Sequence, residues 1–201
     1  MTLSLTRKKQ LLFGASLLPL LGFVVQQLVS GGGPDPGKDL VLLTGDWTIR
    51  MLLITLAVTP ARRLLHKPQL LAYRRMLGLF TGFYAMLHFT AVMTYVVGWN
   101  WGRFLEEFSE RPYMAVGILA WLLLLPLIAT SNQWSLRHLR QRWNKLHKLV
   151  YVIAILGVVH VVWLVRSNYA EALVYALLTL LLLGYRLLPS RTARKHRAPV
   201  S

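Results

Sequence analysis

Three of the six histidines lie in or beside long apolar stretches of the sequence, where ionisable side chains are costly to keep and usually functional. His160 comes 13 residues after His147, and His88 comes 13 residues after Arg75. At about 1.5 Å per helical residue, His88 and His160 lie about 20 Å from these basic residues, at matching height. Two imidazoles at one height could hold a metal centre between them. The alternative is two separate core histidines, each hydrogen-bonded to a neighbouring helix.

The type of metal centre is limited by the ligands that the sequence offers. Zinc is usually bound by four ligands, but the chain has no cysteine and no carboxylate at this depth. A haem needs only two axial imidazoles and an apolar pocket, so we expect b-type haem at His88 and His160. The candidate slot for the macrocycle consists of aromatic and small residues, namely Phe80, Phe83, Tyr84, Phe89, Trp121, Trp163, Gly78, Gly82 and Gly157.

The composition is typical of a membrane protein. Of 201 residues, 55% are apolar and 15% are charged, whereas a soluble domain has about 25% charged residues. Six apolar stretches approach the length of about 20 residues that a helix needs to cross a bilayer. We predict an all-α membrane protein in which residues 1–201 form one domain, a bundle of six transmembrane helices. The expected spans are 11–29, 40–61, 76–97, 113–130, 147–165 and 170–188.

The charges indicate the orientation of the spans. The chain has 23 Lys and Arg against 7 Asp and Glu, a net charge of +16. Eighteen basic residues lie in the two terminal segments and the second and fourth connections, whereas all seven acids lie on the other side. The positive-inside rule then predicts that both termini of this multi-pass membrane protein are cytoplasmic. The net charge is a topology signal that also suits anionic membrane lipids, and we expect no nucleic-acid partner.

A transporter or channel is the alternative class, in which intramembrane histidines would relay protons or bind a metal ion. Such proteins are expected to carry carboxylates within their spans, or broken helices in matching halves. The sequence has Pro126 inside the fourth span but no repeat between its halves. A purely structural anchor subunit is a further alternative, but it would not need two histidines at matching height.

Motifs spread over the whole chain carry a family resemblance. They are Arg74–Leu79 ahead of Leu87-His88, Arg111–Tyr113, Thr130-Ser131, Leu146–Tyr151 ahead of His160, Gly33–Asp39, and Thr44-Gly45. With histidines on the third and fifth of six spans, the chain resembles the ferric-reductase-like transmembrane domain that is shared with NADPH oxidases. More narrowly, it resembles the MsrQ (YedZ) family, the haem-binding membrane subunits of the bacterial MsrPQ methionine sulfoxide reductase system.

The resemblance implies an electron-transfer subunit with one or two b-type haems, and FMN is also associated with the family. Electrons would come from the quinol pool or a cytoplasmic flavin reductase. They would pass to a periplasmic molybdenum enzyme of the MsrP type, which repairs oxidised proteins by reducing methionine sulfoxide. The membrane subunit would not itself reduce methionine sulfoxide. By resemblance, His88 and His160 match the axial pair of the outer haem, and His147 matches an inner-haem ligand.

The third span departs from the oxidase pattern, which has two histidines there. The inner position reads Arg74-Arg75, and arginine is always charged and is not expected to ligate iron. Either arginine could instead bind a haem propionate or a flavin phosphate. An inner haem would then be absent, held by one ligand, or completed from elsewhere, with His66 and His138 as candidates. The sequence contains no G-x-G-x-x-G motif, so any NADPH would be used by a separate protein.

His147 and His160 would not face the same direction on an ideal helix. Thirteen residues rotate a helical position by about 140° relative to the first. If both histidines face one side, the helix must be distorted, and a π-bulge near Gly157 would serve.

Other charged residues lie toward the outer side. Arg50 comes one turn after Asp46 and is expected to form an ion pair with it, the alternative being a propionate or quinone contact. Glu106, Glu107 and Glu110 either attract a basic docking partner or form an ordinary solvated loop.

Overall fold

The computed structural model describes residues 4–31, 33–165 and 169–187, and within these ranges the chain is helical, with no β-strand. Arg166, the basic residues beyond position 187 and the last residue of the sixth expected span lie outside the described residues. In the described part, six helical segments are long and apolar enough to cross a membrane, as predicted.

The spanning segments begin and end within a few residues of the predicted ones, except that the first, third and fifth begin six to eight residues earlier. The third is a composite that opens with a 3₁₀ turn and closes with a π-helix. The six segments are α1 (Leu5–Ser30), α2 (Pro36–Leu64), η1–α3–η2 (Pro68–Leu70, Leu71–Ala91 and Val92–Val97), α5 (Pro112–Ala129), α7–α8 (Gln141–Leu146 and Leu149–Leu164) and α9 (Ala170–Leu187).

Polar side chains at the connections start several of these helices. Asp35 caps α2 by accepting a hydrogen bond from the backbone N–H of Lys38 at 3.0 Å, and Pro36 occupies the first helical turn. Asn132 caps α6 (Gln133–Leu139) by accepting from the backbone N–H of Ser135 at 2.7 Å. These caps satisfy donors that a helix cannot satisfy internally.

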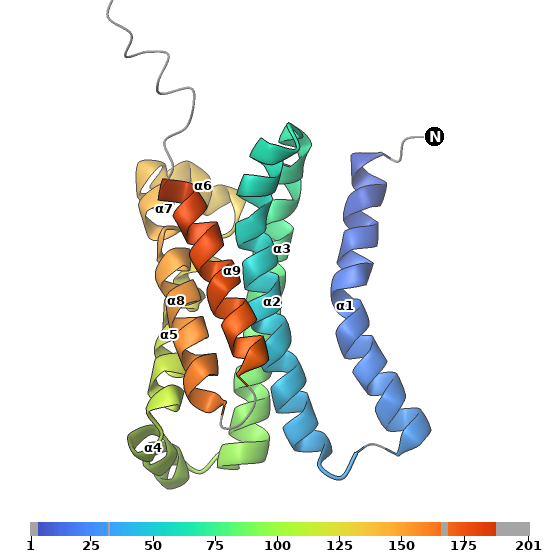
Figure 1. Cartoon of the computed structure of the whole chain (residues 1–201), viewed down its shortest axis with the longest axis vertical. Helices are drawn as coiled ribbons and strands as arrows, with labels where there is room; N and C mark the ends of the chain where they lie inside the picture. The colour runs from blue at the N-terminus through green and yellow to red at the C-terminus, as the bar shows by residue number, and fades with distance from the viewer. Residues whose placement is uncertain (1–3, 32, 166–168, 188–201) are drawn as a thin grey trace, which may run out of the picture.

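The bundle is built mainly from the packing of α2 on α3 and of α5 on α8, with α9 against α8 and α2 (Figure 1). Helix α1 stands to one side of this bundle and packs on α2 and α3. The hydroxyl of Tyr84, on α3, donates a hydrogen bond to the carbonyl of Ser16, on α1, at 2.7 Å. Most of the other α1 side chains are exposed and apolar, as expected of a surface that lipid covers.

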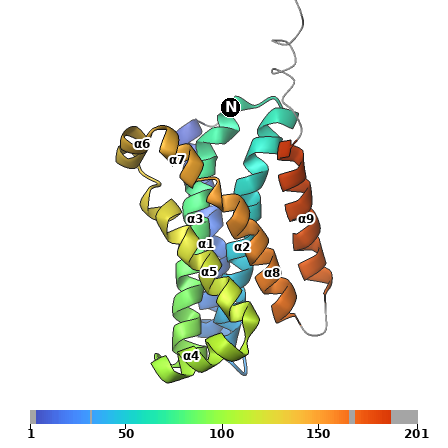
Figure 2. The ribbon, with the colours of Figure 1, turned by 90° about the vertical axis from the view of Figure 1, so that its left-hand side faces the viewer.

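The two ends of the bundle carry opposite charge. Helices α6 and α7 lie at one end together with the end of α9, and α4 (Trp101–Glu110) lies at the other (Figures 1 and 2). We call the first the basic end, because it carries the arginines and lysines that close α2, open α3 and follow α5. We call the second the acidic end, because all seven acidic residues lie at it or toward it.

The structure differs from the sequence prediction in two connections. The stretch before the fourth span contains α4, whose exposed Trp101, Leu105 and Phe108 form an apolar stripe beside its acidic residues. The π-bulge near Gly157 that would turn His147 and His160 to one side does not occur in α8, which is a regular α-helix there; the π-helix is Val92–Val97. Instead, the fifth span is broken by a turn at His147-Lys148, between α7 and α8.

Candidate functional site

His88 and His160 lie side by side in the half of the bundle nearer the acidic end. His88 comes from α3 and His160 from α8, and their ring centroids are 6.4 Å apart with the rings at 81°. The two helices are separated by 72 positions in the sequence at these residues, so the pairing arises from tertiary packing. Their convergence agrees with the expectation drawn from their matching heights.

Both rings are oriented by a backbone carbonyl of a neighbouring helix. Nδ1 of His88 lies 3.0 Å from the carbonyl oxygen of Val41, on α2, and Nδ1 of His160 lies 2.6 Å from that of Tyr113, on α5. Because a carbonyl oxygen only accepts, each Nδ1 donates its proton. This tautomer leaves a lone pair on each Nε2, which is the arrangement of a metal-ligating histidine.

On both neighbouring helices, a glycine lies one turn after the residue whose carbonyl bonds the histidine, and it lets the imidazole ring approach that helix closely. A Cβ atom on Gly45 would lie 3.0 Å from Cε1 of His88, and one on Gly117 would lie 2.7 Å from Nδ1 of His160. The spacing is the same on both helices, because Gly45 follows Val41 by four residues and Gly117 follows Tyr113 by four. We call each carbonyl–glycine pair a ring cradle. The sequence analysis noted Gly45 only within a family motif and did not single out Gly117.

The donor set fits a haem better than a bare metal ion. An imidazole nitrogen binds a metal at about 2 Å, and the ring centre lies about 1 Å behind it, so two rings on opposite sides of one iron have centres about 6 Å apart. The observed 6.4 Å agrees with this separation. Within the described ranges, no group of three or more histidine or acidic side chains could hold a metal ion.

The aromatic surroundings differ in part from the expected haem slot. Phe89 stacks on Trp121 with ring centroids 4.1 Å apart, and the indole Nε1 of Trp121 is buried without a hydrogen-bond partner in the described structure. Phe80 and Tyr84 instead pack toward α1, and Trp163 is 55% exposed. These three residues therefore do not enclose the histidine pair.

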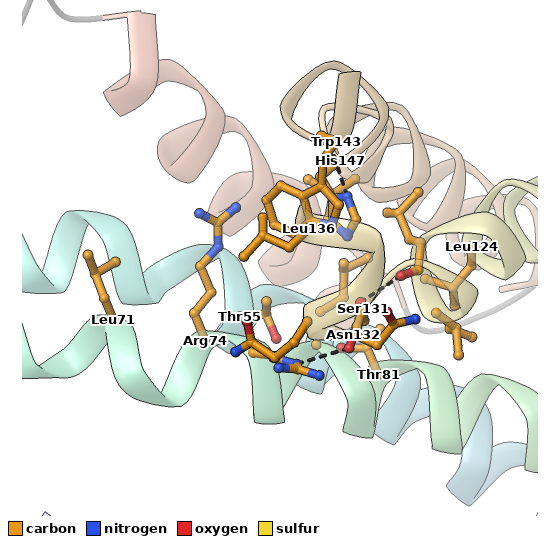
Figure 3. Close-up of a pocket in the computed structure, with 17 residues that line it drawn as sticks. Thr55, Leu71, Arg74, Thr81, Leu124, Ser131, Asn132, Leu136, Trp143 and His147 are labelled. Carbon is orange, nitrogen blue, oxygen red and sulfur yellow. Dashed lines mark hydrogen bonds between the residues drawn. The ribbon is translucent and has the colours of Figure 1, made fainter. Parts of the chain in front are cut away.

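His147 lies in a separate cavity of about 330 Å³ near the basic end (Figure 3). Its ring stacks on Trp143 at 3.8 Å, and its Nδ1 donates to the carbonyl of Trp143 at 3.2 Å. Its Nε2 is buried and has no hydrogen-bond partner in the described part of the chain. The cavity is lined by Leu52, Thr55, Leu71, Arg74, Arg75, Gly78, Thr81, Leu124, Leu127, Ile128, Ser131, Asn132, Gln133, Leu136, Trp143, His147 and Val150.

Arg74 and Arg75 both line this cavity but differ in their partners. Nε of Arg75 donates to the carbonyl of Ser131 at 2.9 Å, which ties α3 to the end of α5. The guanidinium of Arg74 is half-buried and makes no hydrogen bond or ion pair within the described ranges. Figure 3 shows its side chain rising from α3 on the side where His147 and Trp143 lie.

His66 and His138 were the sequence candidates for completing an inner haem. His66 is exposed and has a positive φ of 54° just before η1. His138 is also exposed and stacks on Trp134, with ring centroids 4.1 Å apart. Neither residue is among those that line the cavity, so the structure does not bring either to His147.

Arg50 belongs to an ionic cluster between α2 and α9. The predicted pair with Asp46 is present at 3.5 Å, but a shorter ion pair, at 2.6 Å, joins Arg50 to Glu171. Nε of Arg50 also donates to the hydroxyl of Tyr175 at 2.9 Å. The sequence analysis missed the second pair because Glu171 lies 121 residues away and meets Arg50 only through the packing of α9.

Comparisons with known proteins agree with these features. Residues 44–158 match the family model described as ferric reductase like transmembrane component. The protein-methionine-sulfoxide reductase heme-binding subunit MsrQ of Xanthomonas euvesicatoria pv. vesicatoria (strain 85-10) is 42% identical over 97% of this chain and 92% of its own length. The MsrQ subunit of Xanthomonas campestris pv. campestris (strain B100) is 46% identical over 83% of this chain and 78% of its own length. No solved structure shows significant similarity.

Proposed function

The chain belongs to the MsrQ family of haem-binding subunits within the ferric-reductase-like transmembrane proteins, and from this premise we propose the path of its electrons. The chain carries electrons across the bacterial inner membrane through b-type haem. It delivers these electrons to a periplasmic molybdenum enzyme of the MsrP type, which reduces methionine sulfoxide. The donor is the quinol pool or a cytoplasmic flavin reductase. The observation that carries the proposal is the pairing of His88 with His160 at 6.4 Å, each with Nδ1 bonded to a carbonyl.

The residues of the paired site have distinct roles in this proposal. A b-type haem, when bound, supplies reversible one-electron chemistry at its iron. His88 and His160 would hold the iron through Nε2. The carbonyls of Val41 and Tyr113 fix the tautomer and orientation of the rings and raise their basicity as ligands. Rigid support of this kind keeps the site in one geometry in both redox states.

The cavity at the basic end is proposed to take a second redox cofactor, either haem or FMN. His147 offers a buried Nε2 without a partner, as an iron ligand does before it binds. Arg74, and at the rim Arg75, would pair with a propionate or a phosphate. His147 and His160 are 13 residues apart in sequence, or about 20 Å along the helical axis, so the two sites would divide the crossing into two stages.

The orientation in the membrane follows from the charges of the two ends. The basic end is proposed to face the cytoplasm and both termini with it, in agreement with the positive-inside rule. The acidic end then faces the periplasm, where Glu106 and Glu110 on α4 are exposed to a docking partner. Glu107 differs from these two, since it forms an ion pair with Arg111 at 2.9 Å.

An anaerobic electron-transfer assay tests the proposed function. The purified chain is loaded with haem, reduced with dithionite, and mixed with an MsrP-type enzyme and methionine sulfoxide. We expect the haem absorbance to return to the oxidised spectrum only when both enzyme and sulfoxide are present. Omitting methionine sulfoxide is the control for accidental oxidation. A haem spectrum that stays reduced in the complete mixture would contradict the proposal.

A further inference from the structure

Helix α4 lies across the acidic end of the bundle rather than along it (Figures 1 and 2). The third span ends at Val97, and Gly98 and Trp99 then turn the chain, with positive φ values of 67° and 55°. Asn100 caps the new helix by accepting a hydrogen bond from the backbone N–H of Arg103 at 3.1 Å. Because α4 joins the ends of two spanning segments, it lies at the height of the membrane surface.

One side of α4 is apolar and open. Trp101, Leu105 and Phe108 follow one another at spacings of four and three residues, so they lie on one face of the helix. Their exposed fractions are 72%, 62% and 41%. We call these three residues the apolar face of α4. Large apolar side chains that lie together on a surface usually mark a contact with a protein or a membrane.

The acidic side chains of α4 point away from the apolar face. Glu110 comes nine residues after Trp101, which at about 100° per residue places it on the opposite side of the helix. Glu106 and Glu110 are both exposed. A carboxylate is costly to place in hydrocarbon, so this side of α4 must face water.

A third side of α4 contacts the bundle, between the apolar face and the acidic side. Glu107 forms an ion pair with Arg111 at 2.9 Å, and its side chain is only 17% exposed. Phe104 packs against the buried cluster of Met93, Val97 and Met114. The bundle therefore lies beside α4, with the apolar face on one flank and the acidic side on the other. A helix held in this way at the membrane surface can turn one flank to lipid and the other to water.

We infer that the partner of the apolar face is the lipid surface itself. Helix α4 lies in the headgroup region, with its apolar face toward the acyl chains and with Glu106 and Glu110 toward water. The two spans that α4 joins also carry exposed apolar side chains, which the hydrocarbon covers, among them Tyr95 and Val96 on η2 and Leu119 and Leu122 on α5. Tryptophan is enriched at this depth, as Trp101 would be. The membrane thereby fixes the direction in which the acidic side chains of α4 point.

Single labels on the two flanks of α4 test this placement. The chain contains no cysteine, so one introduced cysteine is a unique attachment point for a fluorescent label. Leu105→Cys places the label on the apolar face, and Glu106→Cys, at the next residue, is the matched control on the acidic side. Each haem-loaded variant is labelled with nitrobenzoxadiazole and reconstituted in phosphatidylcholine nanodiscs. Quenching is measured with nitroxide-labelled phosphatidylcholine in the bilayer and with iodide in the water.

The two quenchers are expected to act in opposite order on the two labels. The lipid nitroxide should quench the label of Leu105→Cys several-fold more strongly than that of Glu106→Cys, and iodide should show the reverse. A nitroxide near the headgroup should quench Leu105→Cys more than one at the end of the acyl chain, because an interfacial helix lies about 5–10 Å into the headgroup boundary.

Two results would overturn the lipid contact. Equal iodide quenching of Leu105→Cys and Glu106→Cys would mean that the apolar face lies in water. Protection of Leu105→Cys from both quenchers would mean that protein covers this face, either a second copy of the chain or another subunit. If either variant does not fold, Phe108→Cys and Glu110→Cys decide by the same criteria. The haem spectrum and the electron-transfer assay report on the proposed function separately, because neither measures where α4 lies.

Discussion

The two histidine sites differ in how far the chain itself completes them. His88 and His160 face each other from different helices, and each ring is held by a carbonyl and approaches a glycine. His147 has one oriented nitrogen, no second histidine lines its cavity within the described ranges, and the cavity is bordered by the guanidinium of Arg74. In the proposed function, the first site is preorganised for one iron, whereas the second needs its ligand to satisfy the buried polar groups.

This difference predicts unequal consequences of losing each histidine. We expect His88→Ala or His160→Ala to remove the haem of the paired site altogether, because a single imidazole and an apolar pocket remain. Reduced-minus-oxidised absorption spectra of purified protein measure the loss. His138→Ala is the control, since His138 is exposed and does not line the cavity. A normal bis-histidine spectrum in either of the first two variants would break the pairing.

Losing His147 is expected to affect the basic end alone. In His147→Ala the second cofactor should be lost, while the spectrum of the paired site stays as in the wild type, because the two sites share no side chain. Cofactor content per chain, measured by haem and flavin extraction, checks this. Loss of all haem from protein that remains helical would show that the two sites are not independent.

The ring cradles predict an intermediate effect at two glycines. In Gly117→Ala the new Cβ would lie 2.7 Å from Nδ1 of His160, so the ring must leave its carbonyl partner. Loss of such a supporting hydrogen bond typically lowers metal affinity about 10- to 100-fold. Gly45→Ala should have a smaller effect, because its contact with His88 is 3.0 Å. Haem titration of the purified variants measures both affinities.

Gly157→Ala is the matched control for the cradles. Gly157 lies on α8, as His160 does, but a Cβ atom at Gly157 would meet no atom within 4 Å. Haem affinity in this variant should equal that of the wild type. Equal losses in Gly157→Ala and Gly117→Ala would mean that glycine acts through helix flexibility rather than through close approach.

The smallest effect is expected at the acidic end. Changing Glu106, Glu107 and Glu110 together to Gln should slow association with a basic periplasmic partner by less than about tenfold, and more at low than at high ionic strength. Stopped-flow mixing over a salt series measures the rate. A rate that is unchanged at every salt concentration would make these residues an ordinary solvated surface of α4.

The spans and the equal heights of His88 and His160 could be predicted from the sequence, because each depends only on positions along a single helix. Apolar length gives the spans, and depth along a helix gives the matching heights of His88 and His160. It did not predict the ring cradles, because Gly45 and Gly117 matter only through helices that pack against the histidines. The contacts of Arg186 were missed for the same reason, since its partners are on α2 and α8.

The two differences in local structure also have physical causes. The rotation between His147 and His160 was calculated for one continuous helix, but a turn at His147-Lys148 separates α7 from α8. Helix α4 was not among the expected elements, because it is too short and too charged to span a membrane. Its exposed apolar stripe alternates with acidic residues, as in a helix that lies along an interface.

The most direct test of the account is low-temperature electron paramagnetic resonance of the oxidised, haem-loaded protein, with His147→Ala beside the wild type. The account predicts a low-spin ferric signal from a haem with two imidazole ligands, and it predicts that this signal is retained in His147→Ala. A site with only one strong ligand would give a high-spin signal instead. Absence of the low-spin signal from the wild type, or its loss in His147→Ala, would contradict the assignment of His88 and His160 to one iron. A high-spin signal that disappears in His147→Ala would come from the basic-end cavity and would leave this assignment intact.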